Sequence, residues 1–218
     1  GLSEDQIFFQ DNVKKFLEDQ LTLDTVRKIT EGEDDLAKEE LHKGLINLGI
    51  NNILVPEEYG GLGLDLLFAT AVSQSLGEGV ATLPFLGPYI LAPTAIKYGA
   101  SDSQKEKLFA DMSQNLINFG IGFSEYFGSR DSSGLNISDN KVTGKTLFVL
   151  DADFASHVMI ADNKGQIGII SLDSSGIEMI DLTTVDKTRT YKEMHFSNTP
   201  IEILDKTKSS SFAIEMAL

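Results

Sequence analysis

Asn118-Phe119-Gly120-Ile121-Gly122-Phe123-Ser124-Glu125 is the stretch at which the hydrophobic pattern of this 218-residue chain changes. Before it, apolar residues recur at every third or fourth position, which indicates amphipathic helices. After it, short β-branched and aromatic runs alternate with turn residues, which is typical of strands. The sequence therefore predicts an α+β fold, with an N-terminal all-α domain over residues 1–115, a β-barrel domain over residues 116–205 and the start of a C-terminal helical domain over residues 206–218.

The helical half carries two signatures of a helix start. Ser3 with Gln6, and Ser101 with Gln104, have the spacing of a capping box, in which two side chains bond each other's backbone N–H groups. The apolar spacing predicts further helices over residues 36–48, 67–76 and 88–99. Residues 53–64 contain one proline and three glycines, so a turn-rich connection is expected there.

The second half contains β-prone runs separated by turn-forming residues. The runs cover residues 142–150, 157–161, 167–172 and 177–182, and the turns cover residues 131–134, 163–165 and 173–176. Many short strands at this spacing suggest a closed barrel or a sandwich. The change of pattern near residue 116 further predicts two separately packed cores. The pattern becomes helical again from Lys206 and the sequence ends at Leu218, so we expect a truncated chain.

The composition bears on the partners and the compartment. A formal net charge of −15 repels phosphate backbones and anionic headgroups, so neither nucleic acid nor a membrane surface is an expected partner. The chain has no cysteine, and His42, His157 and His195 show no metal-ligand spacing, so no metal site is expected. No leader and no apolar run of roughly 18 residues is recognisable, so a cytoplasmic protein is expected.

Three motif-like stretches indicate other chemistries only weakly. Gly144-Lys145-Thr146 ends like a phosphate-binding loop, but the required earlier glycine is Asp139. Gly120-Ile121-Gly122 begins like a dinucleotide fingerprint, but Glu125 stands where its last glycine would be. Gly122-Phe123-Ser124 begins like a nucleophile elbow, but Tyr126 stands at the last glycine position and no histidine partner is evident. A turn or a strand is the expected structure at all three.

Several segments, in the right order, resemble acyl-CoA dehydrogenases. Residues 54–63 (LVPEEYGGLG) resemble the family's interhelical signature, and residues 98–107 are similar to the helix before its barrel. Phe123-Ser124-Glu125 stands where the family has an apolar residue, a threonine and a glutamate beside the flavin. Residues 142–151 stand where the family places the strand whose aromatic residue packs near the flavin ring. The resemblance covers essentially the whole chain.

The resemblance implies an FAD site. The cofactor-binding residues that it implies are Phe123, Ser124, Glu125, Phe148, Val149 and Leu150. A flavin that accepts a hydride needs hydrogen-bond donors near its polar edge and a small hydroxyl near its reacting nitrogen, which the backbone around Phe123 and the Ser124 hydroxyl can supply. Phe148 can wall one side of the ring; the alternative is that it is an ordinary aromatic residue of the barrel.

The sequence departs from the family pattern at two places. Residues 126–131 (YFGSRD) replace a proline and glycines in the loop that would accept the CoA arm, where Ser129 and Arg130 are the expected substrate-binding residues. Phe148 replaces the commoner tryptophan, and Leu150 replaces a hydroxyl residue. The run Phe148-Val149-Leu150-Asp151-Ala152, with Thr188-Arg189-Thr190 further on, resembles divergent members that degrade steroid and other bulky acyl-CoA thioesters, some of which work as unlike pairs of subunits.

The resemblance implies α,β-dehydrogenation of an acyl-CoA, in fatty acid or steroid degradation. A carboxylate base must remove the α proton. Glu215 is the only candidate here, and a solvated helix glutamate is its alternative interpretation. We therefore expect a flavoprotein fragment that is inactive alone, with an electron-transfer flavoprotein-like acceptor and a homo- or hetero-oligomeric state. The alternatives are a non-catalytic subunit of a heteromeric acyl-CoA dehydrogenase, and a binding module without flavin.

Overall fold

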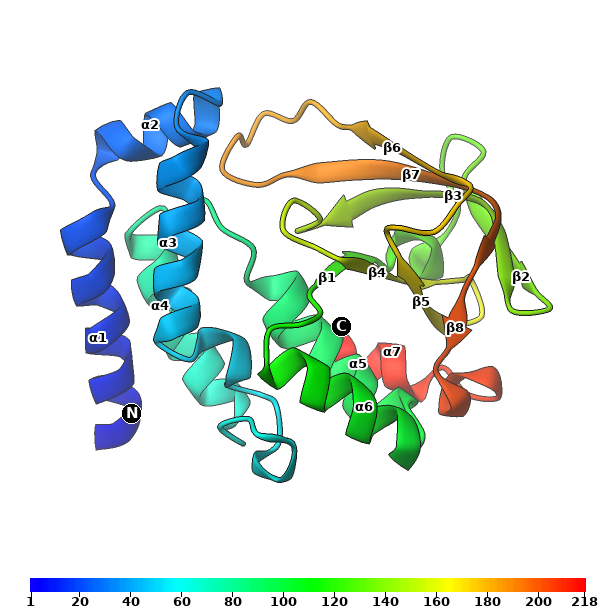
Figure 1. Cartoon of the computed structure of the whole chain (residues 1–218), viewed down its shortest axis with the longest axis horizontal. Helices are drawn as coiled ribbons and strands as arrows, with labels where there is room; N and C mark the ends of the chain where they lie inside the picture. The colour runs from blue at the N-terminus through cyan, green and yellow to red at the C-terminus, as the bar shows by residue number, and fades with distance from the viewer.

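The computed structural model describes all 218 residues, and it places a helical part beside a curved β-sheet (Figure 1). The helices are α1 (Glu4–Gln20), α2 (Leu23–Glu31), α3 (Asp35–Asn47), α4 (Leu66–Glu78), α5 (Ala92–Gly99), α6 (Asp102–Ser113) and α7 (Phe212–Ala217). Single helical turns are η1 (Ile50–Asn52), η2 (Glu57–Tyr59), η3 (Gly87–Leu91), η4 (Ser124–Phe127) and η5 (Asp205–Lys208). None of the helices combines the length and the hydropathy needed to cross a bilayer.

Both predicted capping boxes form. The N–H of Ser3 donates to Gln6 Oε1 at 2.9 Å and the N–H of Gln6 donates to Ser3 Oγ at 3.2 Å, and the same arrangement starts α6 at Ser101. Helix α2 is not predicted by the apolar spacing, although it has local signals at both ends. Its N-cap Thr22 accepts from the N–H of Thr25 at 3.1 Å, and Gly32 ends it with a φ of +74°, a conformation that suits glycine.

The strands are β1 (Phe119–Gly122), β2 (Gly134–Ser138), β3 (Lys141–Leu150), β4 (His157–Ala161), β5 (Ile167–Ser171), β6 (Ile177–Asp181), β7 (Tyr191–Pro200) and β8 (Glu202–Ile203). The predicted strands over residues 142–182 correspond to β3, β4, β5 and β6, whereas β2, β7 and β8 are not predicted. Strand β7 is missed because Met194 and Phe196 are its only buried apolar residues, although they alternate with the polar Glu193 and His195 as strand residues do. The predicted α+β fold class, helices followed by a β domain, is confirmed.

The eight strands form one sheet that curls around its own core. Its order is β6-β7-β3-β1-β4-β5-β8, with β2 beside β3, and only β1 and β4 are parallel. The outermost strands of this order, β6 and β8, pair with β7 and β5 but not with each other. Strands from both sides of β1 nevertheless share one apolar core, which includes Val142 and Met194 from β3 and β7, and Ile160 and Ile170 from β4 and β5. The sheet is therefore barrel-like, with an open seam between β6 and β8.

The largest apolar cluster spans the join near residue 116. Its 19 buried residues include Ile96 and Phe109 from α5 and α6, Phe119 and Ile167 from β1 and β5, and Ile214 from α7. A second cluster of 16 buried residues belongs to the helical half. The expectation of two separately packed cores is wrong, because α5 and α6 bury their apolar faces against the sheet and against α7.

Candidate functional site

The predicted flavin-facing residues lie where β1 ends and η4 begins, next to an irregular part of β3. A pocket of about 120 Å³ opens there, lined by Ser124, Glu125, Phe127, Gly128, Arg130, Leu147 and Phe148. Gly122 permits β3 to approach β1 closely, because a Cβ at Gly122 would lie 3.2 Å from side-chain carbons of Thr146 and Val149. The strand before the site is thus held against the strand that carries Phe148.

Strand β3 bulges at Leu147 and Phe148. Its pairing with β7 shifts register between Thr146 and Val149, and Phe148 has a φ of +56°. The left-handed region costs a residue with a side chain roughly 1–2 kcal/mol. Such a conformation persists only where the surrounding structure imposes it. The bulge leaves the Phe148 ring 44% exposed beside the pocket.

Ser124 and Glu125 satisfy both backbone polar groups of Leu147. The Ser124 hydroxyl donates to the Leu147 carbonyl oxygen at 2.5 Å, and the Leu147 N–H donates to Glu125 Oε1 at 3.3 Å. Ser124 Oγ also lies 3.3 Å from Glu125 Oε1, but its single hydrogen points to the much nearer carbonyl. The Ser124 hydroxyl can therefore only accept a hydrogen bond from a ligand.

The carboxylate of Glu125 is turned into the protein. Only 2% of the residue is exposed, and Ser133 Oγ donates to its Oε2 atom at 2.7 Å. Ser133 Oγ in turn accepts from the N–H of Arg130 at 2.9 Å, so the carboxylate also fixes the 126–131 loop near Arg130. The sequence predicts residues 131–134 only as a turn, and nothing local indicates that Ser133 reaches this site.

The other predicted site residues are distributed between the pocket and the cores. Arg130 lines the pocket, whereas Ser129 is exposed outside its lining. Phe123 is buried in the core shared with the helices, and Val149 is buried inside the sheet. Leu150 pairs with Ile121 of β1. The structure therefore brings Ser124, Glu125, Arg130 and Phe148 together, and the side chains of Phe123, Ser129, Val149 and Leu150 do not line the pocket.

Glu215 lies on α7 and is linked to the site loop without lining the pocket. The Tyr126 hydroxyl donates to Glu215 Oε1 at 3.2 Å, and Ser211 Oγ donates to the same oxygen at 2.7 Å. Glu215 is exposed. Its position connects α7 to the residue after Glu125, and both of these donors are neutral hydroxyl groups.

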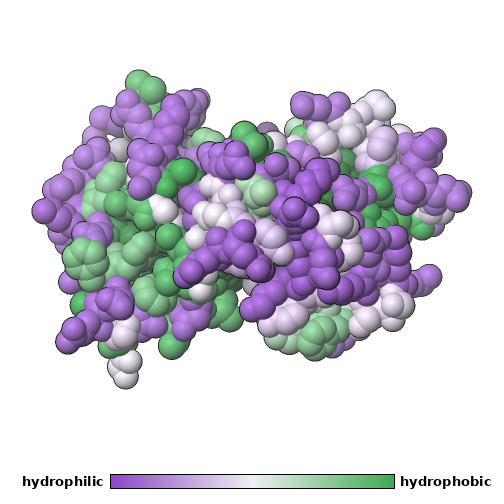
Figure 2. All heavy atoms as spheres, turned by 60° about the horizontal axis from the view of Figure 1, so that its bottom comes forward, coloured by the Kyte–Doolittle hydropathy of each residue, from purple (hydrophilic) through white to green (hydrophobic).

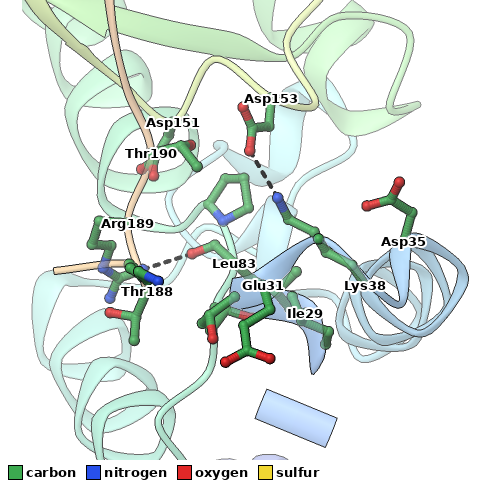
Figure 3. A pocket seen from close by; sticks show the side chains of 15 residues that line it. Ile29, Glu31, Asp35, Lys38, Leu83, Asp151, Asp153, Thr188, Arg189 and Thr190 are labelled. Carbon is green, nitrogen blue, oxygen red and sulfur yellow. Dashed lines mark hydrogen bonds and ion pairs between the residues drawn. The ribbon is translucent and has the colours of Figure 1, made fainter. Parts of the chain in front are cut away.

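A larger cavity of about 360 Å³ lies between the helical half and the sheet (Figure 3). In it, Lys38 of α3 forms an ion pair with Asp153 at 2.7 Å, and Arg189 Nη1 donates to the Leu83 carbonyl oxygen at 2.7 Å. Asp151, which follows β3, is 4% exposed and also lines this cavity. The sequence does not predict Asp151 and Asp153 as site residues, because their partners lie in distant loops and helices.

Asp151 combines deep burial with several hydrogen-bond donors. Burial raises the pKa of its carboxyl above the ordinary value, while the N–H of Gly87, the charge of Arg189 and the N–H of Phe85 oppose that rise. The carboxyl accepts from the N–H groups of Gly87 at 2.8 Å and Phe85 at 3.3 Å. It therefore fastens the end of β3 to the connection before η3.

The residues around the 120 Å³ pocket fit one edge of a flat heteroaromatic ring such as that of a flavin. Phe127 and Phe148 are 70% and 44% exposed and both line the pocket, so their rings are accessible to a planar ligand. Ser124 offers an acceptor and Arg130 offers a cationic group. Pockets that enclose a whole ligand measure roughly 300–1,000 Å³, so this pocket would hold only part of a cofactor.

Comparison with known proteins identifies the family of this chain. Residues 3–115, more than half of the chain, match the model of the acyl-CoA dehydrogenase N-terminal domain. The chain belongs to the acyl-CoA dehydrogenase family, as the sequence resemblance implied. A structure of the ChsE4-ChsE5 complex from Mycobacterium tuberculosis has the same fold, with a TM-score of 0.82 at 17% identity over 99% of this chain and 60% of that chain.

The curated relatives are considerably longer than this chain. Mitochondrial isovaleryl-CoA dehydrogenase from Bos taurus is 29% identical over 147 residues, which are 66% of this chain and 32% of the relative. Acyl-CoA dehydrogenase FadE26 from Mycobacterium tuberculosis is 28% identical over 112 residues, 49% of this chain and 28% of the relative. The matched segments thus cover less than a third of the length of each of these relatives.

Proposed function

We propose that the chain forms part of an FAD-dependent enzyme that dehydrogenates an acyl-CoA thioester between its α and β carbons. The observation that carries this proposal is the meeting of Ser124, Arg130 and Phe148 at one pocket, in a chain of this family. Bound FAD would supply the hydride acceptor. The Phe148 ring would face the flavin plane, and the Ser124 hydroxyl would accept a hydrogen bond from the cofactor.

Arg130 and the 126–131 loop are the proposed contacts for the substrate. The guanidinium group can pair with a phosphate or hold a thioester oxygen, which favours a CoA ester in an otherwise acidic chain. Ser129 remains a proposed contact for a part of the substrate that extends beyond the pocket. An electron-transfer flavoprotein-like protein is the proposed electron acceptor, and fatty acid or steroid degradation is the proposed process.

A second candidate function is a non-catalytic subunit of a heteromeric acyl-CoA dehydrogenase. It is favoured by the lack of a free carboxylate in the pocket lining, where Glu125 is the only acid and is held by protein hydrogen bonds. Exposed apolar side chains on the helical half also support association with another chain (Figure 2). They include Phe8, Leu66 and Leu67, which are 71%, 57% and 56% exposed.

Flavin content and flavin reduction distinguish the two candidates. The chain is purified alone and in the longest natural form that contains it, titrated with FAD, and mixed anaerobically with short-chain and steroid acyl-CoA thioesters. Bleaching of the flavin absorbance by any of them supports a dehydrogenase. A stable complex with another acyl-CoA dehydrogenase subunit, in which only the other subunit binds flavin, supports the non-catalytic role. Failure of every assembly to bind flavin rejects the dehydrogenase.

A further inference from the structure

We propose that Glu125 is a positioning residue, which with Ser133 imposes the Leu147–Phe148 bulge and thereby fixes the Phe148 ring at the pocket. The significance of that ring for a ligand rests on the proposed function, whereas the bulge itself does not. Both oxygen atoms of the carboxylate already accept hydrogen bonds from the protein, so Glu125 acts through other residues.

The bulge requires substitute partners for the backbone of Leu147. Where β3 shifts register against β7, Leu147 has no Cα partner on β7. A buried N–H or carbonyl without a partner is strongly unfavourable, so other groups must bond it. Glu125 accepts from the Leu147 N–H, and Ser124 donates to the Leu147 carbonyl. Two consecutive side chains therefore replace two ladder hydrogen bonds that a regular strand would have made.

This arrangement explains why Phe148 retains an unfavourable conformation. Glu125 holds the peptide plane between Thr146 and Leu147, and Ser124 holds the plane between Leu147 and Phe148. Together they fix the backbone on both sides of Leu147 as it leads into Phe148, which has a φ of +56°. Ser133 holds Glu125 Oε2 at 2.7 Å and stops the carboxylate from turning toward the pocket. Without Glu125, the Leu147 N–H is released, and Phe148 can return to the extended conformation that ordinary strand residues prefer.

A single tryptophan at position 148 makes the ring position measurable. The chain contains no tryptophan, so Phe148→Trp creates one reporter whose emission, anisotropy and acrylamide quenching describe position 148 alone. The side chain is partly exposed, so the larger ring can be accommodated. The measurement is made without flavin or substrate, so its outcome is independent of whether the proposed function is correct.

The decisive variants in this Phe148→Trp background are Glu125→Ala, Glu125→Gln and Asp162→Ala. Asp162, in the turn between β4 and β5, is the matched control, because it is also a buried carboxylate that accepts from backbone N–H groups, those of Lys164 at 2.8 Å and Gln166 at 2.9 Å. It does not line the pocket. Glutamine retains one acceptor oxygen, so it should rescue the reporter signal in part.

We expect Glu125→Ala to shift the emission of the reporter tryptophan to longer wavelength, lower its anisotropy and increase its quenching. Glu125→Gln should give smaller changes, and Asp162→Ala should give none. Unchanged reporter signals in a folded Glu125→Ala protein would overturn the proposal, as would equal changes in Asp162→Ala. If Glu125→Ala does not fold, Ser133→Ala decides, because it removes only the hydroxyl that holds Oε2; unchanged signals in that variant would also overturn the proposal.

Discussion

Asp151 accepts a hydrogen bond from the backbone N–H of Gly87 at 2.8 Å, which joins the end of the strand carrying Phe148 to the helical half. Asp151 is 4% exposed, and burial is the largest influence on its raised pKa. A carboxyl group with a raised pKa in the folded state stabilises the fold fully below its unfolded pKa. That stabilisation is lost as the pH rises through the folded pKa.

We therefore predict that Asp151→Asn gains stability relative to the wild type as the pH rises from the unfolded pKa of Asp151 through its folded pKa. Asparagine keeps an acceptor oxygen for the N–H groups of Gly87 and Phe85, but it cannot ionise. Urea unfolding at a series of pH values measures the difference in the free energy of unfolding. Asp151→Ala is the control, because it should show the same pH trend at lower stability throughout. A difference between Asp151→Asn and the wild type that does not vary with pH would contradict the prediction.

Ser124→Ala should lower the free energy of unfolding and slow the reduction of flavin. Loss of the Ser124 hydroxyl leaves the Leu147 carbonyl without this donor, which should cost roughly 1–3 kcal/mol in the free energy of unfolding. If the proposed dehydrogenase function is correct, flavin reduction by an acyl-CoA should also slow, while the cooperative melting transition persists. Ser129→Ala provides a matched serine in the next loop that lies outside the pocket lining, and it should leave stability nearly unchanged. Unaltered flavin reduction in Ser124→Ala would remove Ser124 from the site.

The left-handed backbone at Phe148 predicts an inverted preference for glycine over alanine. Phe148→Gly should be more stable than Phe148→Ala by about 1 kcal/mol, because glycine has no Cβ to disfavour a positive φ. Phe127 is also an exposed phenylalanine of the pocket but does not have a positive φ, so Phe127→Gly should be less stable than Phe127→Ala. Thermal unfolding of the four variants checks both orders. The same order at both positions would contradict the bulge geometry.

The shared core predicts where a protease cuts first. Val185 is fully exposed in the connection between β6 and β7, so limited digestion with a protease of broad specificity, such as proteinase K, should begin in that connection. The join near residue 116 should resist, because it leads directly into β1, which lies between β3 and β4. Mass spectrometry of the early fragments identifies the site. First cleavage at the join, with release of two folded halves, would show that the cores are separate.

The predictable features are those encoded by neighbouring residues. Capping boxes at Ser3 and Ser101 act over three residues, and the apolar strands β3 to β6 are recognisable from their composition. Strand β7 needs its partners to be recognised, because many of its side chains are polar. The site depends on longer separations still: Ser124 and Glu125 reach Leu147 from 23 and 22 positions away. No local pattern could indicate that register shift, or the positive φ of Phe148.

Because Ser124 and Glu125 complete the hydrogen bonding of β3 as well as lining the pocket, they have little freedom to diversify. A substitution that changed what the pocket accepts would also weaken the sheet behind it. The exposed side chains of the 126–131 loop, such as Phe127, are not needed for the hydrogen bonding of β3. Changes in ligand preference during evolution, or in the laboratory, should therefore accumulate in this loop while the pair behind it stays constant.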